Sequence, residues 1–339
     1  MLLQLPAACF AAFALTAACS GGGSSHALKP TPTPTPSATA SPTPSPTPAP
    51  VDLLTGLPSP ASGPLVAIKV DNAVLARPYQ TGLSRAAVVY QELVEGGSTR
   101  LLAVFESSLA GLREVGPIRS VRESDVELVR QFGKIDIGFS GGNTGVKAIV
   151  RTAARNGWLI DASYDVRPGA YRLGAQRRDA RNFFAVPSAL AAHPGNGAVD
   201  IGLRFGAPAV GGVPLASAVA TYAAQSRVTL RYNPAAFTWS VAQDGRLMGG
   251  VGPANVVIQR VVERPSGFRD VHGQPTPYTV TAGAGAVTVL RDGQRFTGTW
   301  KRAGHGATHF LGASGKDIPL RPGPTWVLLV PTSGGISFG

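Results

Sequence analysis

The chain has 339 residues, of which 44% are apolar, and its formal net charge is +12 at pH 7. Roughly 290 residues follow the N-terminal segments described below, which is enough to bury an ordinary core, most simply as two domains. Both cysteines, Cys9 and Cys19, lie near the N-terminus, so the sequence excludes a disulfide-stapled scaffold.

Residues 1–18 are typical of a secretory signal peptide. Leu, Ala and Phe dominate this stretch, and Thr16-Ala17-Ala18 directly precedes Cys19. The pattern resembles the lipobox of bacterial lipoproteins, which implies that Cys19 is acylated and anchors the chain outside the cytoplasm. An ordinary signal peptide that leaves a free Cys19 is the alternative. A membrane-spanning helix is disfavoured, because the apolar run is shorter than the ~20 residues needed to cross a bilayer.

If Cys19 carries the lipid, Cys9 is lost with the signal peptide and no thiol remains. That excludes a thiol-dependent enzyme. Residues 19–50 then form a tether, in which prolines alternate with Thr, Ser and Ala from Pro30 to Pro50. Proline lacks a backbone donor and fixes φ, so we expect a semi-rigid polyproline II spacer that holds the folded part away from a membrane.

Most of the basic residues are arginine, and their excess favours anionic partners. The densest cluster lies in the middle of the chain: Arg167, Arg172, Arg177, Arg178 and Arg181. We expect an anionic envelope polymer, a phospholipid surface or a partner protein. An exported protein rarely meets nucleic acid, and no aromatic residues are interleaved with these arginines, which argues against nucleic acid as the partner.

Residues 51–210 are predicted to form a mixed α/β domain. Short apolar runs bounded by Gly, Pro or Asp predict strands at Leu65–Val70, Ala87–Val94, Arg100–Phe105 and Ile135–Phe139. Gly96-Gly97 predicts a hairpin between the second and third of these strands. Helices are predicted at Ser120–Phe132, with Ser124–Glu127 as a capping box, and at Thr144–Asn156.

Residues 211–339 are predicted to form a β-rich domain that is mainly antiparallel, so the fold class is α+β. Asp244-Gly245 and Asp292-Gly293 are strong signals for two-residue hairpins. Trp239, Trp300 and Trp326 are expected in the core. Strands are predicted at Val228–Tyr232, Phe237–Ala242, Asn255–Val262, Tyr278–Thr281, Ala286–Arg291, Arg295–Trp300 and Trp326–Val330.

Several long motifs resemble the DUF3048 family of tethered, secreted proteins. They cover the chain from about residue 53 to 331 and include Val66–Asn72, Ala76–Pro78, Val89–Arg100, Val115–Arg122, Ser140–Gly142, Asn255–Gln259 and Gly323–Trp326. The resemblance implies an architecture and a location but no reaction. Ala180-Arg181-Asn182 departs from the Pro-His-Asn expected there, so no histidine role carries over.

Polar residues at the ends of the predicted N-terminal strands are the candidates for ligand binding. Asp71 and Asn72 follow a predicted central strand, where α/β sheets place ligand contacts. Arg119 and Arg122 flank a turn into a helix, which suits a phosphate clamp. The full set of ligand-binding candidates is Asp71, Asn72, Arg77, Glu92, Glu95, Arg100, Arg119, Arg122, Asp125, Ser140 and Asn143.

Each candidate also has a structural interpretation. Glu92 and Glu95 are three apart on a predicted strand, so they should point to opposite faces and not share one site. Ser140-Gly-Gly-Asn143 could cradle an anion with its amides or only shape a turn. The Arg and Glu residues could instead form an ion-pair network that bridges hairpin and helix.

No metal or cofactor is expected. His305 and His309 have the spacing of a helical zinc pair, but neighbouring glycines in a β-rich stretch argue against a helix. The glycine spacings match neither a P-loop nor a dinucleotide fingerprint.

Two functions follow from these residues. The first is a tethered, non-catalytic module that binds an anionic envelope component or a partner protein. The second is a metal-dependent phosphotransferase or hydrolase, because Val88–Tyr90, Arg100–Phe105 and Gly116–Arg122 are loosely similar to the LytR-CpsA-Psr phosphotransferases. In that case Arg119 and Arg122 would clamp a pyrophosphate, and Asp71 and Asp125 would be the metal or base candidates. Convergence of these residues on one concave pocket would favour the enzyme.

Overall fold

The computed structural model describes residues 50–58, 63–106, 111–174, 183–191, 197, 199–248, 250 and 252–339. All of them belong to the unit Pro48–Gly339. The signal peptide, Cys19, the tether, Arg177, Arg178, Arg181 and the departure at residues 180–182 lie outside the described residues.

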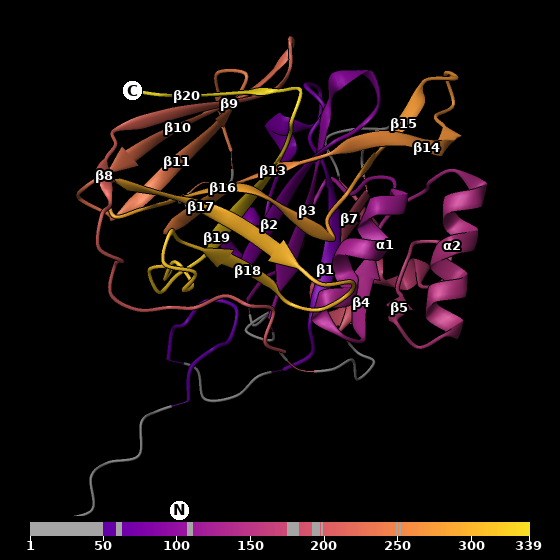
Figure 1. Cartoon of the computed structure of the whole chain (residues 1–339). Helices are drawn as coiled ribbons and strands as arrows, with labels where there is room; N and C mark the ends of the chain where they lie inside the picture. Colours follow the sequence, from indigo (N-terminus) through magenta and orange to yellow (C-terminus); the bar gives the residue numbers. More distant parts are fainter. Residues whose placement is uncertain are drawn as a thin grey trace, which may run out of the picture. The chain divides into compact units, whose positions relative to one another are not determined.

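A large mixed sheet runs through this unit (Figure 1). Within the described residues it has 11 strands, in the order β18-β17-β16-β13-β19-β2-β3-β1-β4-β5, with β8 paired to β17. Their bounds are β1 Val66–Asp71, β2 Val88–Leu93, β3 Thr99–Phe105, β4 Ile135–Gly138, β5 Leu159–Asp161, β8 Val213–Pro214, β13 Asn255–Val261, β16 Gly283–Arg291, β17 Gln294–Arg302, β18 Thr308–Leu311 and β19 Thr325–Pro331.

The predicted hairpin between β2 and β3 is confirmed. The two strands pair antiparallel, and Gly96 and Gly97 adopt φ angles of 64° and 70°, which residues with a Cβ rarely reach. Asp292-Gly293 joins β16 to β17 in the same way, with φ of 50° and 67°.

The described residues of the N-terminal part form three α-helices: α1 Glu123–Val129, α2 Thr144–Arg155 and the short α3 Pro187–Leu190. Single 3-10 turns occur at Arg77–Tyr79, Leu83–Arg85, Glu95–Gly97, Arg130–Phe132 and Pro168–Ala170. The predicted second helix is confirmed as α2, but the predicted capping box is wrong. Helix α1 begins at Glu123, and the Asp125 carboxylate accepts from the Arg122 backbone N–H at 2.7 Å, so Arg122 and not Ser124 precedes the helix. None of the described helices is long and apolar enough to cross a bilayer.

A second sheet has the order β12-β11-β10-β9-β20. Its strands are β9 Ser217–Ala223, β10 Ser226–Asn233, β11 Thr238–Gln243, β12 Arg246–Leu247 and β20 Gly335–Phe338. Buried and half-buried residues alternate along β9 and β11, as expected for a sheet that packs on the core with one face only. Asp244-Gly245 forms the predicted turn between β11 and β12, with φ of 49° and 84°.

The central strands β1–β3 are covered on both faces. Ala67, Leu102 and Val104 belong to a core that contains the buried faces of α1 and α2. Their neighbours Ile68, Leu101 and Ala103 belong to a second core that includes Trp239 and β10 of the five-stranded sheet. Trp239, Trp300 and Trp326 are all buried, as predicted.

The expected boundary at residue 210 is not confirmed, because strands from both sides of it share the large sheet. β19 pairs in parallel with β2, through Thr325↔Val88 to Leu328↔Gln91, and in parallel with β13. The C-terminal half is therefore not purely antiparallel. Two further hairpins form small sheets of their own: β6 Tyr171–Leu173 with β7 Phe183–Ala185, and β14 Glu263–Arg269 with β15 Pro275–Thr279.

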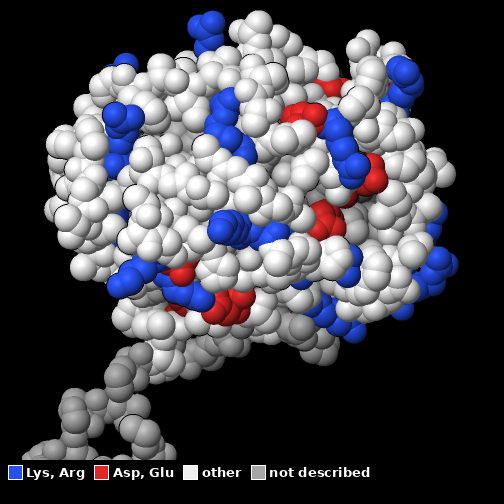
Figure 2. All heavy atoms as spheres, viewed as in Figure 1, with Lys and Arg blue, Asp and Glu red and all other residues white. Residues whose placement is uncertain are grey.

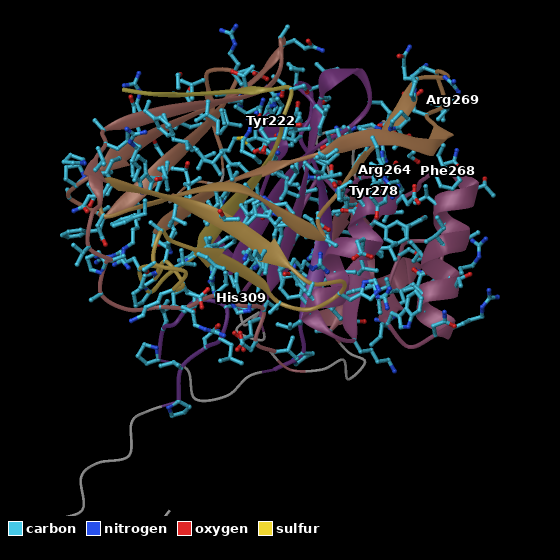
Figure 3. The ribbon with its side chains drawn as sticks, viewed as in Figure 1. Tyr222, Arg264, Phe268, Arg269, Tyr278 and His309 are labelled. Carbon is cyan, nitrogen blue, oxygen red and sulfur yellow. The ribbon has the colours of Figure 1, made fainter. Side chains whose placement is uncertain are left out.

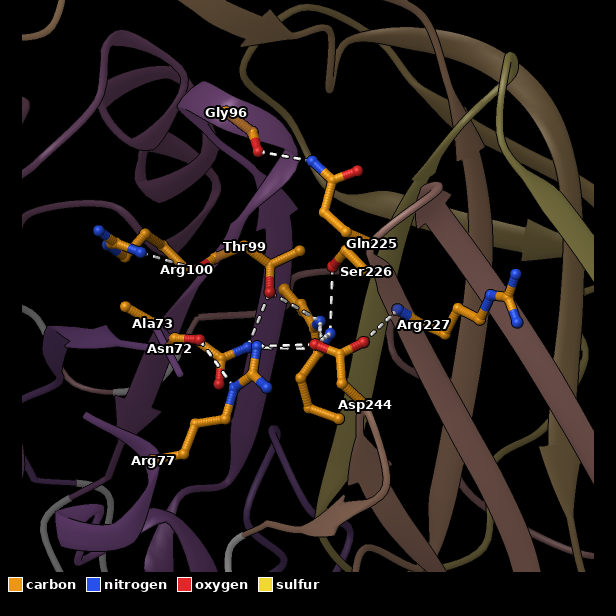
Figure 4. Close-up of polar contacts among 12 residues, drawn as sticks. Asn72, Ala73, Arg77, Gly96, Thr99, Arg100, Gln225, Ser226, Arg227 and Asp244 are labelled. Atoms are coloured by element: carbon orange, nitrogen blue, oxygen red, sulfur yellow. Dashed lines mark hydrogen bonds and ion pairs between the residues drawn. The ribbon is translucent and has the colours of Figure 1, made fainter. Parts of the chain in front are cut away.

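A buried polar joint connects β1–β3 to the five-stranded sheet (Figure 4). Gln243 Oε1 accepts from Gln91 Nε2 at 2.7 Å, and Gln243 Nε2 donates to Ser226 Oγ at 3.1 Å. Asn72 Nδ2 donates to Thr99 Oγ1 at 2.7 Å beside them. Asn72, Gln91, Thr99 and Gln243 are all buried, so each lost hydrogen bond would leave a polar group without water.

We expect Gln243→Leu to lower the free energy of unfolding by about 1–3 kcal/mol, because it strands buried donors of Gln91 and Asn72. Urea denaturation measures the change. Gln225→Leu is the matched control: Gln225 also bonds across to the N-terminal half, at Gly96 O, but it is exposed. Its change should stay within roughly 0.5 kcal/mol. Equal effects of the two substitutions would contradict a role for burial.

Candidate functional site

A pocket of about 680 Å³ opens where the carboxyl end of β1, the N-terminus of α2 and the β14–β15 hairpin meet. Figure 3 shows Phe268 and Arg269 on that hairpin, next to the end of α2. The lining residues are Glu95, Arg100, Arg119, Ser120, Val121, Arg122, Gly142, Asn143, Thr144, Val146, Arg269, Asp270, Val271, His272 and Thr276.

The pocket arginines come from the end of the sheet. Arg100 is the second residue of β3 and lies opposite Asp71, the last residue of β1. The segment that follows residue 116 lies along β1, with Asp71 N bonded to Pro117 O and Arg119 N bonded to Lys69 O. Because this segment is hydrogen-bonded to β1, Arg119 and Arg122 lie at the same end of the sheet as Arg100.

Asp71 lies behind these arginines. Its carboxylate is fully buried and contacts Arg100 Nη1 at 3.3 Å and Arg119 Nε at 3.4 Å. Asp71 Oδ1 also accepts from Ala73 N at 2.9 Å. Asp71 is thus a buried counter-ion that orients the two guanidinium groups.

Glu95 pairs with Arg122 on the pocket wall. Arg122 Nη2 lies 2.5 Å from Glu95 Oε2, and Thr276 Oγ1 donates to Glu95 Oε1 at 2.6 Å. Burial favours a raised pKa for Glu95, but the hydrogen bonds and charge of Arg122 outweigh it and hold the pKa below its usual value. Glu95 therefore fixes Arg122 in place as a carboxylate. Glu95 lies in a 3-10 turn beyond β2, so it does not share the strand of Glu92 that the sequence predicted.

Positive charge exceeds negative charge in this pocket. Four arginines line it, against the carboxylates of Glu95 and Asp270. Burial lowers the pKa of Arg100, and nearby Arg122 and Arg119 lower it further, while Asp71 opposes them. Among the described residues, Arg100 Nε and Arg122 Nε have no hydrogen-bond partner. An incoming anion would relieve this repulsion.

Basic side chains also occur well away from the pocket. On the face drawn in Figure 2, Lys and Arg are spread over much of the surface, several of them beside Asp or Glu. Net charge alone therefore does not single out a site. The pocket differs because its arginines converge on one hollow and two of them are largely buried.

The N-terminus of α2 forms another wall. Asn143 Oδ1 accepts from Gly145 N at 2.8 Å and caps the helix, while Asn143 Nδ2 donates to Arg269 O at 3.0 Å. A Cβ on Gly145 would lie 2.3 Å from the Phe268 ring, so glycine lets the hairpin close on the helix. The positive end of the helix dipole adds to the arginine charges.

Asp125 and Glu92 do not line the pocket. They are buried together with Lys69, whose Nζ contacts Glu92 Oε1 and lies 2.6 Å from Asp125 Oδ1. Ser124 Oγ donates to Glu92 Oε2 at 2.8 Å. Burial and then the charge of Glu92 raise the pKa of Asp125 to about 7, against the opposing effect of Lys69. This closed cluster matches the structural interpretation of the two carboxylates.

Asn72, Arg77 and Ser140 also lie elsewhere. Asn72 belongs to the polar joint, and Arg77 Nη2 pairs with Asp244 at 2.8 Å beside it. Ser140 Oγ donates to the backbone oxygen of Ile118 at 3.2 Å. The structure thus brings Asp71, Glu95, Arg100, Arg119, Arg122 and Asn143 to one site and separates the other five candidates from it.

The hairpin residues of the pocket were missed by the sequence analysis. Arg269, Asp270, His272 and Thr276 lie about 150 residues after Arg119 in the chain. The two strands of this hairpin contain Pro265, Pro275 and Pro277, and proline removes ladder donors, so the residues there give little strand signal. Lys69 was missed as well, although a lysine inside an apolar strand signals a buried partner.

His305 and His309 face different carboxylates. His305 Nδ1 lies 3.0 Å from Glu127 Oε1, and His309 Nδ1 lies 3.2 Å from Asp317 Oδ1. In the part of the chain that the structure describes, no group of three or more His, Cys, Asp or Glu residues is arranged to hold a metal ion.

Comparisons with known proteins agree with this architecture. "Putative lipoprotein YerB" of Bacillus subtilis (strain 168) is 26% identical over 290 residues, which cover 78% of this chain and 81% of that protein. The crystal structure of the YerB protein from Bacillus subtilis superposes with a TM-score of 0.70 and 22% identity, over 85% of this chain and 99% of that chain. Residues 54–198 match the family "Protein of unknown function (DUF3048) N-terminal domain", and residues 218–327 match its C-terminal domain. The chain belongs to the DUF3048 family.

Proposed function

We propose that this protein is a membrane-tethered, extracytoplasmic lipoprotein whose arginine pocket binds a phosphate-bearing component of the cell envelope. The convergence of Arg100, Arg119 and Arg122 on one hollow carries the proposal. Guanidinium groups present several donors in a plane, which suits phosphate oxygens. The capped N-terminus of α2 adds further positive potential on the same side.

Binding is favoured over phosphotransfer by the positions of the two carboxylates that would act as base or metal ligand. Asp125 is buried in the Lys69 cluster, and Asp71 is buried behind the arginines that it orients. Neither carboxylate is offered to a ligand in the pocket. Two carboxylates line the pocket itself. Glu95 is held by Arg122, and Asp270 Oδ1 accepts from His272 N and Gln274 N within its own turn.

The tether supports the proposed location. A lipid on Cys19 would hold the unit Pro48–Gly339 at a membrane surface, with the Pro-rich segment as spacer. The lipoprotein name of the YerB relative is in accord with this anchor. An anchored pocket meets ligands in the envelope at high local concentration.

Replacement of Arg119 tests the pocket. The Arg119 guanidinium is partly exposed, and the contact given for it within the described residues is one of 3.4 Å with Asp71, so Arg119→Gln should fold normally. We expect its affinity for inorganic pyrophosphate, measured by calorimetry, to fall about tenfold, since a charge-assisted hydrogen bond contributes roughly 1.5–3 kcal/mol. Arg151→Gln, which removes an exposed charge from α2, is the matched control and should change affinity little. A similar loss in both variants would point to net charge and not to the pocket.

Replacement of Cys19 tests the anchor. We expect Cys19→Ser to move the protein from the membrane fraction to the soluble extracytoplasmic fraction, because the acyl chains have no other attachment site. Cys9→Ser keeps the protein in the membrane fraction, since Cys9 belongs to the signal peptide. Immunoblots of fractionated cells report both results. Membrane retention of Cys19→Ser would contradict lipid attachment at this residue.

A further inference from the structure

The buried cluster of Lys69, Glu92 and Asp125 holds one amine against two carboxyl groups. Lys69 Nζ contacts Glu92 Oε1 and lies 2.6 Å from Asp125 Oδ1, and the three side chains are 0%, 2% and 0% exposed, respectively. Cγ of Asp125 is one bond beyond Oδ1, so the amine lies next to a carbon that it can attack. A contact that the fold enforces replaces a bimolecular encounter and favours reaction between the two groups.

The surroundings favour the uncharged forms that such a reaction needs. Lys69 lies within β1 opposite Leu102 of β3, and the whole cluster is closed to solvent, so burial disfavours charged groups there. Burial and then the charge of Glu92 raise the pKa of Asp125 to about 7, against the effect of Lys69, so a substantial fraction of this carboxyl is protonated at neutral pH. A proton that passes from Lys69 Nζ to Glu92 then leaves three uncharged groups.

The other atoms of the cluster are placed for the remaining steps. Asp125 Oδ2 accepts from the backbone N–H of Arg122 at 2.7 Å, and this donor can stabilise negative charge that develops on Oδ2. Glu92 Oε2 accepts from Ser124 Oγ at 2.8 Å, which fixes the carboxyl beside the amine. One ammonium needs only one carboxylate for an ion pair, and here the second carboxyl group lies where a proton carrier would act.

We propose that Lys69 and Asp125 condense to an isopeptide bond that cross-links β1 to α1, with Glu92 as the catalytic proton carrier. Glu92 takes a proton from Lys69 Nζ, and the neutral amine attacks Cγ of the protonated Asp125 carboxyl. The Nζ–Cγ bond forms as the carbonyl electron pair moves onto Oδ2. Glu92 then gives its proton to the Oδ1 hydroxyl and takes a second proton from Nζ. The Cγ–Oδ1 bond breaks and water leaves, so the products are an amide, one water molecule and a protonated Glu92.

This cross-link would brace the arginine pocket from behind. The backbone oxygen of Lys69 accepts from Arg119 N at 2.8 Å, and Asp125 lies one helical turn after Arg122. Lys69 and Asp125 are 56 positions apart in the chain, and covalent closure of such a loop removes conformational freedom from the unfolded state. The sequence after residue 47 contains no cysteine, so a disulfide cannot provide this constraint. Neither residue lines the pocket, so the cross-link is independent of the proposed ligand.

Peptide mapping of the purified full chain, after denaturation, tests the cross-link. Trypsin combined with a protease that cleaves before aspartate releases residues 52–69 and 125–130 as separate peptides when Lys69 and Asp125 are free. An isopeptide bond blocks both the cut after Lys69 and the cut before Asp125. We therefore expect residues 52–70 linked to residues 123–130, with a mass lower by one water than the two peptides together. Separate peptides from the wild-type protein would overturn the proposal.

Variants identify the reacting groups. Glu92→Gln keeps the size of the side chain but cannot carry the proton, so we expect at least about tenfold less linked peptide. Asp125→Ala removes the carbon that is attacked and should give no linked peptide. Circular dichroism verifies that each variant is folded, and the wild-type map decides on the cross-link even if one is not. Full linkage in folded Glu92→Gln would overturn the role of Glu92.

The same digests contain a matched control. Lys147 Nζ lies 2.9 Å from Asp165 Oδ2, as in the buried cluster, but these side chains are 28% and 53% exposed. Water solvates both charged groups there, so this pair should remain unlinked in every sample. Linkage of Lys147 to Asp165 at a comparable yield would overturn the proposal that the buried cluster directs the reaction.

Discussion

The parallel pairing of β19 with β2 is the interaction on which the rest of the described fold depends. Without it, the strands before residue 210 and those after it would be two sheets. Through it, β13 and β16 become part of the same sheet as β1, and the β14–β15 hairpin between them reaches the N-terminus of α2. Arg269 and Thr276 can then meet Arg100 and Arg122 in one pocket.

Strand alternation decides which candidates share that pocket. Lys69, Asp71 and Arg100 follow the side of the sheet that faces α1 and α2, as Ala67 and Leu102 do. Asn72 and Thr99, one residue away, face the five-stranded sheet and enter the polar joint. Residues that are neighbours in sequence therefore lie in different environments. At the ends of β1 and β3, the side chains on one face of the sheet carry the charges of the pocket, and those on the other face join the two sheets.

The sequence was sufficient to predict local structure. Gly96-Gly97 and Asp292-Gly293 fix their hairpins through φ angles that side chains disfavour, and the spacing of Val146, Val150 and Ala153 identifies the buried face of α2. The large sheet was not predictable in the same way. Apolar strands such as β19 and β2 are buried on both faces, and their sequences do not indicate which strand they pair with.

The same distinction applies to the site. Arg119 and Arg122 were identified because a turn before a helix places them at a sheet end, a local feature. Whether Asp125 joined them depended on packing. A carboxylate in the first turn of α1 can face a pocket or a buried lysine, and the rotation of the short helix decides between them. Nothing in the spacing of the residues sets that rotation.

The arginine pocket depends on one irregularity in the sheet. The β14–β15 hairpin is an excursion from the ladder between β13 and β16. Its tip forms a wall of the arginine pocket. An interrupted ladder leaves backbone groups unpaired, which is unfavourable for the fold alone unless water or a ligand satisfies them. The hairpin interrupts this ladder, and it supplies Arg269 and Thr276 to the arginine pocket.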